Sequence, residues 1–259
     1  MSGTRYDGFF IGWSKKLPKG LQVFLPAFAM LLIGLFAGVA YSVAVTQDDP
    51  GDGRFAFNLG RQTVVGVLEA DPYPTIRIPP NETYPDGHTM MLSGPGKRGV
   101  AKQARALDGR VVHATGVLLQ RGDLDMLQVN GGRLRLATAV SEDPAQMPED
   151  LMTAQNLGRW RLTGEICDGK CYVGAMRPGS GLAHKACANL CLTGGIPPVF
   201  VTTGPVEGQT FFLLGDKDGK ALTDRITDLT ALLIKAEGEI ERRGDLLVFK
   251  MDLETVKVQ

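Results

Sequence analysis

The segments TGVLLQRGDLDML (115–127) and EGEIERRGDLLVF (237–249) decide the fold expected for this chain of 259 residues. Aligned with one another, they place Gly116 over Gly238 and share the four letters RGDL. Each has strand-forming residues on both sides of a Gly-Asp pair, which is typical of a β-hairpin with a two-residue turn. The sequence therefore predicts the same hairpin twice.

Two further pairs of segments extend this internal repeat toward the N-terminus. VVGVLEADPYP and RLTGEICDGKCY set Gly66 over Gly164, and HTMMLSGPGK from His88 resembles QTFFLLGDKDGK from Gln209. Because self-similarity along a chain marks a repeated structural unit, we expect two related small β-modules.

Each predicted module contains three strands, a short helical turn and the hairpin, with the helical turn at 100–107 in the first copy and 222–229 in the second. Five strands with a helix between the third and the fourth is the order of an OB-type barrel, which closes its sheet. The expected fold class is therefore mainly β, with two OB-like barrels. Two small sandwiches are the alternative.

An apolar segment precedes the modules. Residues 21–45 carry no charged side chain and exceed the roughly 20 residues that span a bilayer, so they predict one transmembrane helix; a cleaved signal peptide is the alternative. Cations before it and acids after it predict a single-pass protein of the inner (cytoplasmic) membrane, with a cytosolic N-terminus and periplasmic or extracellular modules. Gly34, Gly38 and Ser42 form a small-residue face for helix packing.

The predicted organisation has six parts. They are a cytosolic segment (1–20), the transmembrane helix (21–45), a tether (46–54), the first β-module (55–143), a linker helix (144–158) and the second β-module (159–259). The linker helix is expected because Pro148 suits a first helical position and Gly158 a helix end.

The second module is longer than the first. The offset between the copies is 98 residues from Gly66 to Gly164 but 122 from Gly116 to Gly238, so the second copy holds 24 additional residues. They fall within 167–198, which contains all four cysteines. A segment added to one copy of a repeated scaffold is where function is expected.

The chemistry of this added segment resides in four thiols and one imidazole. Ser180 is predicted to cap a helix over 181–192. The five residues are Cys167, Cys171, His184, Cys187 and Cys191. Spacings of three and four residues place His184, Cys187 and Cys191 on one helix face. Cys167 and Cys171 follow a strand and are expected opposite that face.

Three interpretations of these residues remain open. Two structural disulfides are the first, because an even number of cysteines outside the cytosol usually pairs; we expect them to run from Cys167 or Cys171 to Cys187 and Cys191. A Cu or Zn site with thiolate and His184 ligands is the second. The third is a redox-active dithiol, although no C-x-x-C motif is present.

Composition and motifs narrow the function classes. Lys+Arg and Asp+Glu number 28 each, so no basic surface for nucleic acid is expected. No nucleophile elbow, phosphate-binding loop, dinucleotide fingerprint or zinc-protease motif occurs, and an enzyme is not favoured. We interpret His88 and His113 as structural or surface residues.

The expected function is that of a membrane-anchored accessory, assembly or scaffold protein of a membrane-associated complex. It would bind a protein partner through the disulfide-stabilised segment 167–198, with no cofactor. The alternative is a Cu or Zn carrier, or a thiol-disulfide redox protein, that uses the five residues. One anchor followed by an OB-like domain resembles the layout of the haem chaperone of cytochrome c maturation, from which this chain departs in having two modules and a cysteine cluster.

Overall fold

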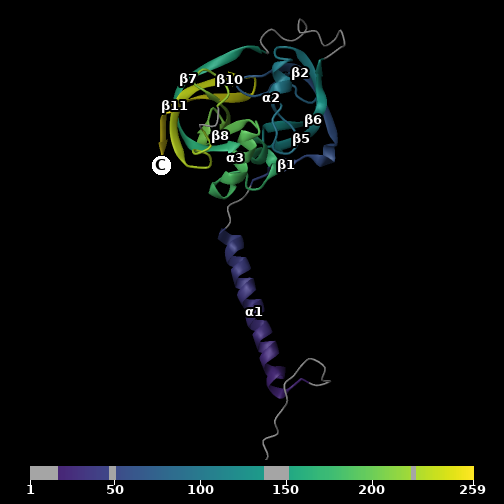
Figure 1. Ribbon diagram of the computed structural model, residues 1–259, viewed down its shortest axis with the longest axis vertical. Coiled ribbons are helices and arrows are strands. Elements are labelled where there is room, and N and C mark those ends of the chain that lie inside the picture. Colours follow the sequence, from purple (N-terminus) through teal and green to yellow (C-terminus); the bar gives the residue numbers. More distant parts are fainter. Residues whose placement is uncertain (1–16, 47–50, 137–151, 223–225) are drawn as a thin grey trace, which may run out of the picture. The chain divides into compact units, whose positions relative to one another are not determined.

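The computed structural model describes residues 17–46, 51–136, 152–222 and 226–259 and, for 131–136, the backbone alone. These residues form a mainly β structure with one long N-terminal helix (Figure 1). The chain divides into two compact units, residues 1–49 and residues 50–259.

Helix α1 (Lys19–Thr46) belongs to the first unit. It has 28 residues and is long and apolar enough to cross a membrane, since its length is about 42 Å at 1.5 Å per residue. A Cβ on Gly34 or Gly38 would meet nothing within 4 Å beyond the helix itself, and the Ser42 hydroxyl donates to the Gly38 carbonyl at 2.8 Å. The small-residue face is thus present on α1, whereas its partner helix, membrane insertion and direction stay predictions.

Residues 54–136 form a six-stranded sheet in the order β1-β5-β2-β3-β4-β6, and β5 also pairs with β6. The pairs are antiparallel except β4 with β6, which run parallel. Helix α2 stands between β4 and β5, where the helical turn was expected. The elements are β1 (Arg54–Phe55), η1 (Phe57–Leu59), β2 (Arg61–Glu69), β3 (Thr75–Ile78), β4 (His88–Ser93), α2 (Ala101–Arg105), β5 (Val111–Arg121) and β6 (Leu124–Leu136).

Residues 154–258 contain a closed barrel of five strands in the order β10-β11-β9-β8-β7, which is closed by pairing between β10 and β7. β9 and β11 run parallel, and the other neighbours are antiparallel. A helical segment lies between β7 and β8. The elements are β7 (Ala154–Asp168), η5 (Cys171–Ala175), η6 (Leu182–His184), α3 (Lys185–Thr193), β8 (Pro198–Val206), β9 (Gln209–Asp216), β10 (Ile234–Arg243) and β11 (Leu246–Val258).

Both predicted hairpins are present. Gly122 and Asp123 join β5 to β6, and Gly244 and Asp245 join β10 to β11. The two glycines have φ angles of 56° and 61°. A positive φ at the first of two turn residues is the requirement that glycine meets in a type II′ turn.

The sheet and the barrel lie side by side (Figure 1). They pack through outward-facing apolar side chains. Because side chains of a strand alternate between its two faces, strands such as β4, β6, β8, β9 and β11 supply one set to an interior cluster and another to this interface. The Tyr73 hydroxyl donates to the Leu222 carbonyl across the interface at 2.8 Å. The buried interface side chains are Tyr73, Met91, Leu119, Leu124, Met126, Cys167, Tyr172, Val173, Val199, Leu213, Leu246 and Val248.

The predicted linker helix is wrong over its last residues. Residues 154–158 are the first part of β7, while 144–151 lie outside the described residues. Ala154 pairs with Arg243 and Asn156 with Glu241 of β10. Hydrogen bonding to a neighbouring strand therefore outweighs the local signals for a helix end.

The helix predicted over 181–192 is present in part, but Ser180 does not cap it. The segment begins with the 3-10 turn η6 and continues as α3, and the residues at the two N-cap positions, Gly181 and His184, make no side-chain capping bond. Gly181 has a φ of 80°, a conformation that glycine adopts readily and serine does not. The chain therefore turns after Ser180 instead of entering a helix there.

Candidate metal centre

Three cysteine thiols meet beside helix α3. Cys187 and Cys191 are four residues apart on α3, and Cys171 begins the helical turn η5 just after β7. Their Sγ atoms all lie within 4.8 Å of one another. Cys171 and Cys191 are buried, and Cys187 is half-buried. The chain thus directs three soft donor atoms toward one point.

The backbone on either side of Cys171 holds this turn in place. The Asp168 carboxylate accepts a hydrogen bond from the Cys171 N–H at 2.8 Å, and so satisfies a donor that a helical start leaves free. The Gly169 N–H donates to the Pro197 carbonyl at 2.8 Å. Ile196 packs against Cys171 and Cys191. The turn and the end of α3 are thereby fixed against one another.

Lys97 reaches the thiols from the first sheet, in the loop that follows β4. Its Nζ lies 2.8 Å from Cys187 Sγ and 3.4 Å from Cys191 Sγ, and it donates to the Cys187 carbonyl at 3.2 Å. The ammonium group therefore stands directly beside two of the three sulfurs.

Other contacts hold the Lys97 loop against α3. Lys170, which is buried, donates from Nζ to the carbonyls of Gly94 and Gly96 at 2.7 Å each. The Gly99 N–H donates to the Gly194 carbonyl at the end of α3 at 2.8 Å. The site is therefore built by the sheet and the barrel together.

The thiols and the ammonium groups alter one another's ionisation. The hydrogen bond between Cys171 and Cys191, with burial, raises the pKa of Cys171, and the same bond lowers the pKa of Cys191. The hydrogen bond to Cys187 raises the pKa of Lys97, and burial lowers the pKa of Lys170 to about 8. The arrangement favours a thiolate on Cys191, and the thiolate is the form that binds metal.

A second buried group adjoins Cys171. His184 Nε2 lies 2.8 Å from Asp168 Oδ2, and the two side chains are only 2% and 0% exposed. His184 Nδ1 lies 3.1 Å from Met176 Sδ. Ligand atoms of Asp168, Cys171 and His184 lie within 4.8 Å of one another. Because both ring nitrogens have a neighbour, the imidazole is held in one orientation.

The structure places Cys167 apart from the other predicted ligands. Its side chain is buried in the interface between the sheet and the barrel, and its Sγ donates to Glu165 Oε1 at 3.3 Å. Burial and the nearby Glu165 carboxylate raise the pKa of this thiol. All four cysteines are free thiols in the structure, so the two expected disulfides are not formed there and stay a prediction.

No sequence motif singles out Asp168, Lys170, Met176 or Lys97. The first two lie between the cysteines of CDGKC (167–171), where polar residues beside possible ligands were an available signal. Lys97 is 90 residues from Cys187 in the chain, and only the packing of the two sheets brings it to the thiols.

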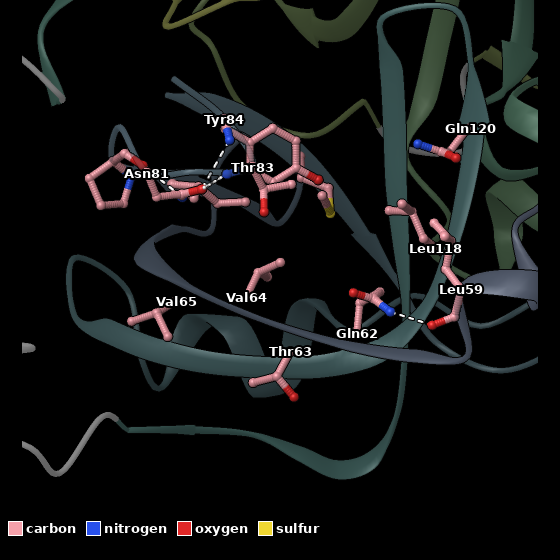
Figure 2. Close-up of a pocket in the computed structure, with 13 residues that line it drawn as sticks. Leu59, Gln62, Thr63, Val64, Val65, Asn81, Thr83, Tyr84, Leu118 and Gln120 are labelled. Carbon is pink, nitrogen blue, oxygen red and sulfur yellow. Dashed lines mark hydrogen bonds between the residues drawn. The ribbon is translucent and has the colours of Figure 1, made fainter. Parts of the chain in front are cut away.

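A separate cavity of about 610 Å³ lies in the first sheet, lined by β2, the β3–β4 segment and β5 (Figure 2). Ile78 and Met90 give it a buried apolar wall. At its rim, Asn81 Oδ1 accepts bonds from the backbone of the following turn, and the Gln62 amide donates to the Leu59 carbonyl. Since these rim groups already have partners within the chain, the thiol cluster is the stronger candidate for a site.

Comparison with protein-family models, curated proteins and solved structures finds no match to this chain.

Proposed function

We propose that this protein binds one thiophilic metal ion, Cu(I) or Zn(II), with Cys171, Cys187 and Cys191 as ligands. The observation that carries the proposal is the convergence of the three Sγ atoms within 4.8 Å of one another. Sulfur atoms about 2.3 Å from one ion lie roughly 3.8–4.0 Å apart in tetrahedral or trigonal geometry. The three thiols therefore need little movement to share an ion.

The surroundings of the thiols support this proposal. Asp168 binds the backbone of Cys171 and orients His184, and such partners around ligands raise metal affinity. Burial of Cys171 and Cys191 keeps water from the sulfurs, and a low local dielectric strengthens the attraction between a thiolate and a cation.

We also propose that the first sheet and the barrel are two related OB-like modules. In both, the first strand pairs antiparallel with the second and the fourth, and the third runs parallel to the fifth. Gly66 and Gly164, aligned in the sequence, occupy the same place: a Cβ on either would meet a backbone carbonyl of the adjacent strand, that of Arg77 or of Val201. On this view segment 167–198 is the addition that distinguishes the second module, and α1 is a membrane anchor with its N-terminus in the cytosol.

Metal titration of the full-length protein tests the proposal. The protein is purified in detergent without oxygen, reduced, and loaded with Cu(I) or Zn(II), and bound metal is measured by elemental analysis. We expect one ion per chain. Loss of a residue that only hydrogen-bonds to a metal ligand weakens metal binding roughly 10- to 100-fold. Cys191→Ala should weaken it by more, because it removes a ligand.

Cys167→Ala is the matched control, since Cys167 and Cys191 are each 1% exposed and both substitutions leave a cavity of the same kind. It should retain full binding. Wild-type protein that takes up no metal, or two variants that lose metal equally, would contradict the proposal. Protein isolated with four hydrogens missing and no metal would favour the structural disulfides and, with them, the accessory or scaffold function.

A further inference from the structure

Resting on the proposed function, we infer that the bound ion is Cu(I), held by three thiolates without a fourth protein ligand, and that Lys97 is the residue that favours it over Zn(II). The ligand count and the position of one ammonium group lead to this inference.

The site offers three sulfur ligands. Among the described residues, the group that meets at the thiols has three members, Cys171, Cys187 and Cys191. Structural Zn(II) sites are almost always four-coordinate. Cu(I) is a soft ion that thiolates select, and because it carries a single positive charge, three thiolates are enough to complete its coordination.

His184 does not supply a fourth ligand in this arrangement. Its ligand atoms meet those of Asp168 and Cys171 rather than all three thiols. Its Nε2 is 2.8 Å from Asp168 and its Nδ1 is 3.1 Å from Met176. Both ring nitrogens therefore already have a partner other than the three sulfurs.

Lys97 places a positive charge beside two of the three sulfurs. Its Nζ lies 2.8 Å and 3.4 Å from their sulfurs. An ammonium group has no lone pair to give a metal, but it donates hydrogen bonds to thiolates. Three thiolates around Cu(I) carry two net negative charges, against one around Zn(II). The cation therefore stabilises the Cu(I) complex more than the Zn(II) complex.

Two measurements on the full-length protein test the inference. X-ray absorption of the Cu(I)-loaded protein should show three sulfur neighbours and no nitrogen or oxygen neighbour. Competition titrations should show that Lys97→Met weakens Cu(I) binding about tenfold more than it weakens Zn(II) binding. Lys102→Met is the control: it removes the same charge from an exposed position on α2 and should change neither affinity.

The outcomes separate this inference from the proposed function. Binding of neither ion would overturn both. One ion held with a fourth, light-atom ligand would overturn the three-coordinate Cu(I) site and leave metal binding intact. Equal effects of Lys97→Met on both ions would overturn the assignment of Lys97. Circular dichroism spectra that match the wild type show that the variants are folded.

Discussion

His88 on strand β4 contacts Asp245 in the β10–β11 turn: its Nδ1 lies 2.5 Å from the Asp245 Oδ2. Its other nitrogen lies 3.3 Å from Asp125, and the Tyr84 ring stacks on it at 4.7 Å. The side chain of His88 is 8% exposed. His88 therefore has a structural role, one of the two interpretations made from the sequence: it ties the first sheet to the barrel.

This contact predicts a pH-dependent stability. Burial alone would lower the pKa of His88, but the carboxylates of Asp125 and Asp245 outweigh it and raise the pKa to about 9. A raised pKa stabilises the fold fully below the unfolded value near 6.5, and the stabilisation is lost as pH rises through about 9. The loss should reach about 3 kcal/mol in the free energy of unfolding.

His88→Gln isolates this effect in denaturant titrations between pH 6 and 9.5. The stability difference between wild type and variant should shrink as the pH rises. Lys170, whose pKa is also shifted, is common to both proteins and cancels. A difference that stays constant with pH would show that His88 is neutral in the folded protein.

The buried pair of Asp168 and His184 predicts a large effect of His184→Ala. The Asp168 side chain is 0% exposed, so the variant leaves a buried carboxylate with the Cys171 N–H but without the imidazole, and breaking such a buried pair costs about 3–5 kcal/mol. Chemical unfolding of the metal-free protein measures the loss. Adding Asp168→Asn should recover part of it because the uncompensated charge is gone; a further loss would argue against this account.

Two glycines of the barrel strands predict Gly→Ala changes of very different effect. A Cβ on Gly164 would meet the backbone carbonyl of Val201, whereas one on Gly204 would meet nothing within 4 Å. Gly164→Ala should therefore lower the free energy of unfolding by about 1–3 kcal/mol, and Gly204→Ala should change it by less than about 0.5 kcal/mol. Thermal unfolding compares them; equal losses would rule out the steric explanation.

The thiols should react with an alkylating agent in a fixed order. Cys187 is half-buried and should be modified first, while Cys167 is 1% exposed, has a raised pKa and should be modified last, because reaction needs an accessible thiolate. Peptide mapping by mass spectrometry after timed alkylation of the reduced native protein gives the order. If Cys167 reacts as fast as Cys187, the Cys167 thiol is not buried between the sheet and the barrel. A parallel sample that has not been reduced tests the expected disulfides: they would protect all four cysteines from alkylation until reductant is added.

Local patterns in the sequence were sufficient for several elements. The uncharged run 21–45 predicts α1, and the repeated RGDL predicts both hairpins, because a hairpin turn depends on a few neighbouring residues and on glycine at a positive φ. Residues 154–158 show the limit of such patterns. Their helix-end signals are local, but they pair with β10, some 85 residues further along the chain.

The sequence by itself determined that the chain is mainly β, that an apolar helix precedes it and that its four cysteines lie in CDGKC and α3. Helical spacing alone brings Cys187 and Cys191 to one face. Only the tertiary structure decided that Cys171 joins them while Cys167 turns into the interface, since neighbouring side chains of a chain can face opposite surroundings. It also decided that Lys97 stands beside the thiols, because that contact depends on the packing of two sheets, and no spacing in the sequence encodes it.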